Sequence, residues 1–449
     1  MTPCTITHVI KRSGAIVPFK TERISNAIYR AAVAVGGRDQ EKAAELADNV
    51  LHILESRFPE GHKPYIEQVQ DVVEEVLIKN GHSKVAKAYI LYRQEQAERR
   101  RSKSHHDSKP SDNIPWAKIW QVLDWAVSHG LHTVDGLNSR IRHGEFPHIV
   151  HESEAAYEDN VQTASELILE RKDTVKMVFI SGPSSSGKTT TTIKLEQRLK
   201  REGLHFVPLN VDNYFFDLEL HPKDEFGDYD FETPQALDLE LINDHLCRLC
   251  RGEEVLVPHY DFKTSSRSAK TTPLHLDDND ILLLDSLHGL YPPMSVDIPD
   301  DVKFKLYLEP LLQMKGPDGD YIRWTDLRLI RRMLRDAAHR SYDPRRTLEH
   351  WHYVRSSEMR TIIPYCTTAN YIVNSGMPYE LALYAHSMRA SFAQWPADYE
   401  GDPLREDACQ RAKRVSALLN AVEPIADDSA VPGDSVLREF IGSSTLKYA

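Results

Sequence analysis

One stretch of the sequence has the residue types and spacing of a phosphate-binding loop. Gly182, Gly187, Lys188 and Thr189 in "FISGPSSSGKTT" fit G-x-x-x-x-G-K-[ST], between an apolar run and a helical pattern. The glycines let backbone N–H groups converge on phosphate oxygens, and the following helix adds the positive end of its dipole. We expect the lysine to reach the β- and γ-phosphates of ATP and the threonine hydroxyl to bind Mg²⁺; the alternative is a Gly/Ser-rich turn. The predicted ATP contacts are Gly182, Ser184, Ser185, Ser186, Gly187, Lys188, Thr189 and Thr190.

Two aspartates follow apolar runs that resemble buried strands. Asp285 ends "ILLLDS", where such folds place a carboxylate near Mg²⁺; the alternative is a solvated strand end. Asp212 ends "VPLNVD", which we expect to be the neighbouring strand, and could accept the proton of an attacking hydroxyl. The predicted metal ligands are Thr189, Asp285 and Asp212.

Arginines recur at near-helical spacing in "RLIRRMLRDAAHR". Guanidinium groups hold the oxygens of a phosphoryl group in transfer through charge-assisted contacts, so this stretch predicts a lid helix. The alternative is an exposed basic face. The residues are Arg328, Arg331, Arg332, Arg335 and Arg340.

The elements that would position these side chains have a parallel-sheet pattern. Between residues 175 and 374, short apolar runs alternate with helical stretches. Such runs indicate a mainly parallel, doubly wound sheet covered on both faces, hence an α/β fold with a P-loop nucleotide-binding core. The expected strands are "VKMVFIS", "HFVPLNVD", "ILLLDS", "KFKLYLE" and "NYIVNS".

The rest of the chain is mostly helical in pattern. We expect a small N-terminal domain over residues 1–98, a polar linker over 99–115 and a helical connecting region over 116–172. The P-loop domain then covers 173–378, and a helical extension covers 379–449.

Composition narrows the class of protein. The net charge of −12 argues against a nucleic-acid duplex as the main partner. No apolar run is long enough to span a bilayer, so we expect no membrane partner and a cytoplasmic location. The 5 scattered cysteines indicate reduced thiols, and Cys247 and Cys250 fall in a helical pattern, which favours a structural reading over a metal or redox site.

Taken together, residues 175–374 resemble the uridine kinase and phosphoribulokinase family. The resemblance rests on "SGPSSSGKTT", "VDNYF", "YDFETPQALDLELI", "VPHYDFKTSSR" and "RRMLRDAAHR", in the family's order. It implies that Lys188, Asp212, Arg332 and Arg335 are catalytic, with Asp212 as general base, and that Arg340 completes a phosphate clamp. Asp285 stands where the family usually has a metal-binding Glu, and ATP and Mg²⁺ are the implied cofactors. The tail "VPGDSVLREFIGSS" and "DSLHGLY" resemble a bacterial subgroup with a C-terminal extension.

The same resemblance implies an acceptor site that departs from the uridine-cytidine kinase pattern. An acid that holds sugar hydroxyls is Glu232 instead of Asp, and Ser265 replaces a base-reading histidine. Fewer base-reading donors put uridine itself in doubt. The implied substrate contacts are Phe231, Glu232, Tyr260, Phe262, Ser265, Tyr342 in place of an arginine, and His350 near a family glutamine.

The N-terminus resembles an ATP-cone, the allosteric domain of ribonucleotide reductases. "HVIKRSGAIVPFKTERISNAIYRAA" gathers cations around a Gly14 turn, which suits a triphosphate; the alternative is a basic solvated hairpin. The implied allosteric contacts for ATP or dATP are Val9, Lys11, Arg12, Lys20 and Arg23.

Three functional hypotheses follow. The first is a kinase that transfers the γ-phosphoryl group of ATP to a nucleoside hydroxyl and is gated at the cone through a change of a homo-oligomer. The second is a nucleotide-binding regulator that no longer turns over. The third keeps the kinase but takes a sugar phosphate or another hydroxylated metabolite as acceptor.

Overall fold

The computed structural model describes residues 6–10, 16–59, 62–102, 114–223, 229, 231–277, 279–340, 343–400 and 405–447. The chain forms two compact units, each described by itself. The first contains Met1–Pro110, Phe215–Asp238 and Tyr260–Arg267; the second contains Ser111–Tyr214, Leu239–His259 and Ser268–Ala449. The domain limits expected above stay a prediction.

The first unit is mostly helical and has its own core. The antiparallel strands β1 (His8–Ile10) and β2 (Ile16–Pro18) precede α1 (Thr21–Val33), α2 (Gln40–Arg57), α3 (Ile66–Lys79) and α4 (Ser83–Ser102). Apolar side chains at helical spacing, such as Ile28, Val50 and Leu77, are buried together. Asp39 caps α2 by accepting a hydrogen bond from the Lys42 N–H at 2.8 Å. The mostly helical pattern expected for this part of the chain is therefore present.

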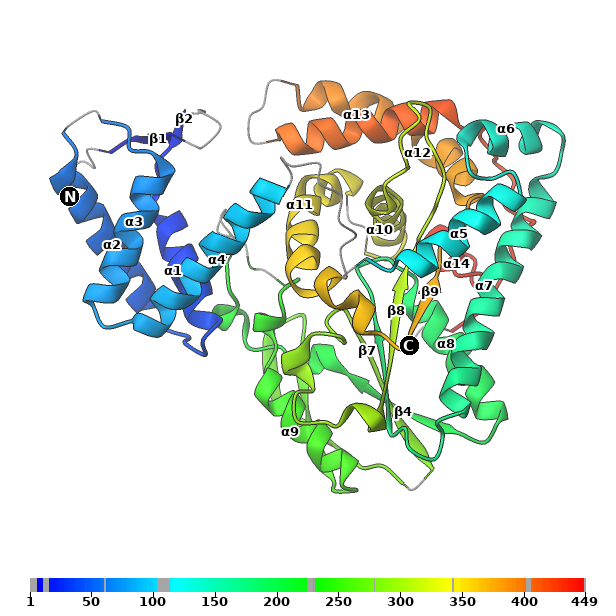
Figure 1. Cartoon of the computed structure of the whole chain (residues 1–449), viewed down its shortest axis with the longest axis horizontal. Coiled ribbons are helices and arrows are strands. Elements are labelled where there is room, and N and C mark those ends of the chain that lie inside the picture. The colour runs from blue at the N-terminus through cyan, green and yellow to red at the C-terminus, as the bar shows by residue number, and fades with distance from the viewer. Residues whose placement is uncertain are drawn as a thin grey trace. The chain divides into compact units, whose positions relative to one another are not determined.

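The second unit is built on a parallel sheet of five strands in the order β4-β7-β3-β8-β9 (Figure 1). Their bounds are β3 (Met177–Ser181), β4 (His205–Asn210), β7 (Asp280–Ser286), β8 (Lys303–Glu309) and β9 (Tyr371–Asn374). All five residues of β3 are buried, because helices cover both faces of the sheet. Figure 1 shows α8 (Lys188–Arg201) and α9 (Leu239–Cys250) on opposite sides of the strands. The α/β prediction is confirmed.

One expectation about the sheet is wrong. The strand that follows the phosphate loop in sequence, β4, is not the neighbour of β3, because β7 pairs with both. The apolar run of β7 is suited to this inner position, where both faces of the strand are covered. The ends of β3 and β4 are therefore two strand positions apart.

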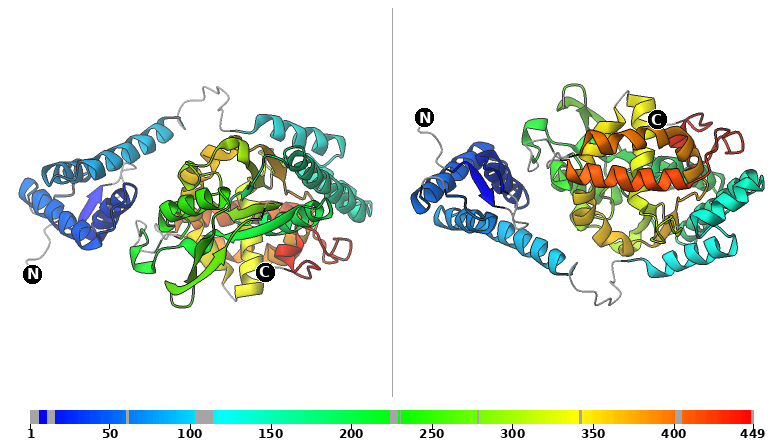
Figure 2. Two further views of the ribbon diagram at one scale, coloured as in Figure 1. Left: turned by 90° about the horizontal axis from the view of Figure 1, so that it is seen from below. Right: turned by 90° about the horizontal axis from the view of Figure 1, so that it is seen from above.

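Helices before and after the sheet complete the second unit. They are α5 (Trp116–Ser128), α6 (Val134–Arg142), α7 (Phe146–Leu169), α10 (Trp324–Arg340), α11 (Pro344–Thr361), α12 (Glu380–Asp398), α13 (Glu406–Ala421) and the short α14 (Arg438–Ile441). Figure 2 shows α12 and α13 side by side. The strands β5 (Val255–Asp261) and β6 (Ser266–Leu274) form a separate two-stranded sheet. No helix in the described ranges has both the length and the apolar character needed to cross a membrane.

Candidate active site

The phosphate loop connects β3 to α8, as the sequence predicts. A Cβ atom on Gly182 would lie 2.3 Å from the carbonyl oxygen of Leu308 in β8, so only glycine allows the loop to pack this closely on the sheet. Gly187 has a φ of +88°, in the left-handed region that favours glycine. Lys188 follows at the start of α8, and its ammonium donates to the Gly182 carbonyl oxygen at 2.9 Å. The lysine thus lies against the loop that it is predicted to serve.

Buried hydroxyls of the loop are available to a ligand. The Oγ atoms of Ser185 and Ser186 are buried and have no hydrogen-bond partner among the described residues. Ser184 differs, because its hydroxyl accepts a hydrogen bond from Arg332. Thr189 is the second residue of α8. Unpaired buried donors are costly, and a phosphate would satisfy them.

The two predicted aspartates lie at the ends of neighbouring strands: Asp285 is the penultimate residue of β7, and Asp212 follows β4. Asp285 lies opposite Asn210 of β4 in the parallel register, and Asp212 lies two residues beyond Asn210. The Asn210 side chain accepts a hydrogen bond from the Asp212 N–H at 3.0 Å. Burial raises the pKa of Asp285 to about 6; Lys188 lowers it, whereas Glu439 and Asp212 raise it. These charges lie close enough together to influence one another.

The residues present fit a magnesium ion bound together with a nucleotide. Among the described residues, no three acidic, histidine or cysteine side chains converge on a ready-made metal site. Mg²⁺ in phosphoryl-transfer sites typically takes only one or two carboxylates, with substrate phosphates and water as its other ligands. The acidic surroundings that raise the pKa of Asp285 favour a cation beside that carboxylate.

The arginines of α10 divide into two groups. Arg328 and Arg331 are fully buried, paired with Glu358 at 2.8 Å and with Glu380 at 2.7 Å. They are held inside the fold, which differs from the exposed basic face considered above.

The second group includes the predicted clamp. Arg332 donates to the Ser184 hydroxyl at 3.1 Å, and both Arg332 and Arg335 contact the carboxylate of Asp336. Arg340 is the last residue of α10, and its side chain lies outside the described residues, as does Tyr342. Arg332 is the predicted clamp residue that the structure brings to the phosphate loop.

Most predicted substrate contacts gather within the first unit. The Phe215 ring lies 6.1 Å from Phe231, 5.6 Å from Tyr260 and 6.2 Å from Phe262 between centroids. The Ser265 backbone has a φ of 54°, and its carbonyl accepts a hydrogen bond from the Leu218 N–H. Glu232 follows Phe231 directly in a turn.

One predicted substrate contact lies elsewhere. His350 belongs to α11 of the second unit, where its ring lies 5.9 Å from that of Tyr353. His350 thus belongs to a different unit from the aromatic residues described above.

The predicted cone contacts are described in part. Val9 is buried in β1, Lys20 precedes α1, and Arg23 lies in the first turn of that helix. Lys11 and Arg12 fall outside the described residues.

The sequence did not reveal that the C-terminal segment "VPGDSVLREFIGSS" contacts the phosphate loop. The Glu439 carboxylate accepts hydrogen bonds from the Thr190 N–H at 3.2 Å and from its hydroxyl at 3.0 Å. A Cβ atom on Gly187 would lie 2.4 Å from Cγ2 of Val436. These residues are 249 positions apart in sequence, and no local pattern indicates their contact.

Two family models match the chain, in separate segments. The ATP cone domain matches residues 7–98, and the phosphoribulokinase / uridine kinase family matches residues 177–381. A vitamin B12-dependent ribonucleoside-diphosphate reductase of Thermoplasma acidophilum is 38% identical over 20% of this chain and 12% of its own length. The cone segment thus has relatives in proteins of a different kind.

Two curated relatives of the second segment are named uridine kinase. A uridine kinase of Bacillus pumilus is 32% identical, over 36% of this chain and 69% of its own length. A uridine kinase of Deinococcus deserti is 28% identical, over 47% of this chain and 94% of its own. A solved structure of a possible uridine kinase from Bacillus stearothermophilus aligns with a TM-score of 0.32 at 16% identity, covering 48% of this chain and 98% of that one. The match to relatives and family model, on a chain with an intact phosphate loop, shows that this protein belongs to the phosphoribulokinase / uridine kinase family and carries an ATP cone domain.

Proposed function

We propose that the protein transfers the γ-phosphoryl group of ATP to a hydroxyl group of a nucleoside. Family membership indicates an ATP-dependent kinase. The observation that carries the proposal is the electrostatic environment of Asp285. Both Lys188 of the phosphate loop and Asp212 beyond β4 lie close enough to Asp285 to shift its pKa. A cation that holds phosphates and a carboxylate that accepts a proton are the two groups that such a transfer needs.

Each residue has a distinct part in this reaction. The loop amides and Lys188 would hold the terminal phosphates, and Arg332 would neutralise charge that develops on the transferred group. Thr189 and Asp285 would hold Mg²⁺, which supplies further charge stabilisation when it is bound. Asp212 is exposed, so its carboxylate can accept the proton of the acceptor hydroxyl.

The acceptor is proposed from the aromatic cluster of the first unit. Phe231 and Phe262 are 41% and 59% exposed, while Tyr260 is buried beneath them. Exposed aromatic rings that pack on a buried ring offer stacking surfaces for a planar nucleobase. Glu232 would hold the sugar hydroxyls.

Regulation by ATP or dATP at the cone is part of the proposal. Within the first unit, Tyr29 and Arg38 donate to the carbonyl oxygen of Leu220 at 2.9 and 3.1 Å. Arg38 also lies 4.1 Å from the centre of the Phe216 ring. The contacted segment, residues 216–220, begins four residues after Asp212, so a change in the cone could reach the proposed base through it.

A screen of ATP consumption tests the proposed function. We expect turnover with one or more ribo- or deoxyribonucleosides, and a loss of roughly 10²- to 10⁴-fold in kcat for Asp212→Asn. Asp244→Asn, an exposed change on α9, is the matched control and should stay near wild type. Turnover with sugar phosphates alone would move the acceptor to that class, and no turnover with any acceptor would favour a regulator.

The regulatory part needs a separate measurement. We expect the rate to depend on the ratio of ATP to dATP at fixed total nucleotide. Arg38→Gln should weaken that dependence, because it removes a contact between the cone and the 216–220 segment. A rate that is flat at every ratio in the wild-type protein would show that the cone does not gate the reaction.

A further inference from the structure

The C-terminal segment 431–441 places a carboxylate on the phosphate loop. The groups that contact Glu439 are the N–H and the hydroxyl of Thr190, in the first turn of α8. In a phosphate loop, amides at this helix N-terminus cradle the α- and β-phosphates of the nucleotide. Glu439 is 7% exposed, so its charge is removed from water and directed at these donors. The carboxylate therefore stands where a phosphate oxygen would bind.

The segment is fixed to the second unit on both sides of this contact. Asp434 pairs with Lys194 of α8 at 2.9 Å, and the Ser435 hydroxyl donates to the buried Glu154 of α7. Phe440 packs against the guanidinium of Arg331, whose Cζ lies 5.0 Å from the centre of the Phe440 ring. Placement of Glu439 is thus a property of a packed segment.

We propose that segment 431–441 is an internal competitor of the nucleotide, and that ATP binds only when Glu439 leaves Thr190. Both anions need the same donors at the positive end of the α8 dipole, so one excludes the other. Removal of the Glu439 charge therefore raises the affinity of the loop for ATP. This inference rests on the proposed binding of ATP by the phosphate loop.

Equilibrium binding of ATP tests the competition. The full chain is compared with Glu439→Gln, with Lys188→Ala, and with Glu400→Gln, an exposed glutamate as matched control. ATP binding that is present in the wild type and lost in Lys188→Ala is assigned to the phosphate loop. ATP that still binds to Lys188→Ala is assigned to the cone. We expect Glu439→Gln to bind ATP about fivefold or more tightly at this site than wild type or Glu400→Gln.

The outcomes separate the inference from the proposed function. If Lys188→Ala binds ATP as well as wild type, the loop is not the ATP site and the proposed function fails. If the loop binds ATP but Glu439→Gln binds with equal or lower affinity, the glutamate does not compete and the inference fails.

Hydrogen exchange gives a second readout that needs no substitution. In the wild-type protein, saturating ATP should speed amide exchange in segment 431–441, because the segment leaves the loop. Slower exchange in that segment with ATP would show that it forms part of the nucleotide site and would overturn the proposal.

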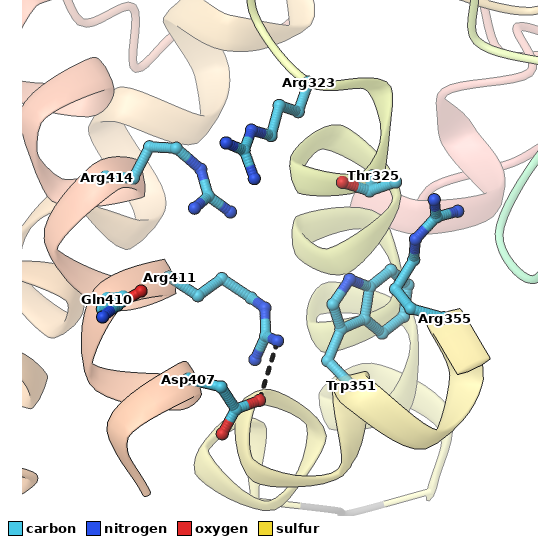
Figure 3. Close-up of a pocket in the computed structure, with 8 residues that line it drawn as sticks. All are labelled: Arg323, Thr325, Trp351, Arg355, Asp407, Gln410, Arg411 and Arg414. Atoms are coloured by element: carbon cyan, nitrogen blue, oxygen red, sulfur yellow. Dashed lines mark hydrogen bonds and ion pairs between the residues drawn. The ribbon is translucent and has the colours of Figure 1, made fainter. Parts of the chain in front are cut away.

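A separate cavity carries a second, independent inference. It has a volume of about 480 Å³ and lies among α10, α11 and α13 (Figure 3). Four arginines and one acid line it together with Trp351: Arg323, Arg355, Arg411, Arg414 and Asp407.

The cations of this cavity exceed its anions. Three of the four arginines are paired: Arg414 with Asp326 at 2.7 Å, Arg411 with Asp407 at 3.0 Å and Arg355 with Glu358 at 2.7 Å. The exposed Arg323 has no side-chain partner among the described residues. Trp351 is 1% exposed, and its buried Nε1 has no hydrogen-bond partner there either. A cavity with surplus guanidinium charge and an unpaired donor suits an anion.

We infer that this cavity binds a small phosphate-bearing metabolite. Pyrophosphate is the probe, added to protein saturated with ADP so that the nucleotide sites are filled. We expect a saturable change in tryptophan fluorescence that is lost in Trp351→Phe and needs about tenfold more pyrophosphate in Arg323→Gln. Arg251→Gln, an exposed change on the same chain, should respond as wild type does. A response that is absent, or equal in Arg323→Gln and wild type, would overturn the inference.

Discussion

Neighbouring arginines on α10 serve two different purposes. Arg331 is buried, and its guanidinium is paired with Glu380 and with the carbonyl of Ser375. Arg332, one residue later, is partly exposed and donates to the phosphate loop. Successive positions on a helix point about 100° apart, so the first side chain enters the core while the second reaches the loop. Charge of the same kind therefore stabilises the fold at one position and contacts the phosphate loop at the next.

The pKa values of Arg331 and Lys118 show how an ion pair changes the protonation of a buried cation. Burial alone would lower the pKa of Arg331, but Glu380 and Tyr384 beside it raise the pKa overall. Lys118 gives the opposite result, because burial lowers its pKa to about 8 and only Asp159 opposes the shift. A buried cation thus keeps its proton firmly only when a carboxylate is packed against it.

The largest expected effect that tests the distinction between the two groups of α10 arginines is a change in stability. Arg331→Met should lower the free energy of unfolding by about 3 to 5 kcal/mol, because it leaves Glu380 buried without its cation. Urea denaturation measures the change. Arg335→Met, on the same helix but partly exposed, is the control and should cost less than about 1 kcal/mol. Equal losses in the two variants would break the distinction between the two groups of arginines.

The next effect should fall on activity alone. Arg332→Gln should lower kcat by roughly 10²- to 10³-fold, because it removes a donor directed at the phosphate loop. Its urea midpoint should match that of the wild type. A variant that loses stability but keeps its turnover would assign Arg332 to the fold instead of the reaction.

The smallest effect is a pH dependence of stability. Between about pH 8 and pH 10 the unfolded chain keeps the Lys118 proton that the folded protein has lost, so the unfolding free energy should rise with pH. Below that window Lys118 should contribute no slope. Lys118→Met should flatten the rise, whereas Lys172→Met, an exposed lysine, should not. The same slope in wild type and Lys118→Met would show that Lys118 keeps its proton when it is folded.

Local sequence predicts those parts of the site that a local segment forms by itself. The phosphate loop is such a part, because Gly182, Gly187 and Lys188 lie within seven residues and their strand and helix adjoin them. The five strands were also evident, since each is a short stretch rich in apolar residues between helical patterns.

Contacts between distant segments could not be read in this way. The position of β7 between β3 and β4 depends on chain topology, which a list of strands does not specify. The roles of Arg328 and Arg331 depend on Glu358 and Glu380, which helical spacing in α10 does not reveal. Glu439 reaches Thr190 through the fold of the whole second unit. Sequence spacing therefore identified the charged residues but not their partners.

The inner position of β7 also sets a distance. Adjacent strands lie roughly 4.8 Å apart, so one intervening strand separates the ends of β3 and β4 by about 9 to 10 Å. The sheet thus fixes the separation between the loop that follows β3 and the carboxylate beyond β4. Its backbone spacing is the same for every side chain that β7 could carry, so substitutions along β7 would leave this separation nearly unchanged. The distance from the phosphate loop to Asp212 can therefore be changed only through the lengths of the connections that follow β3 and β4.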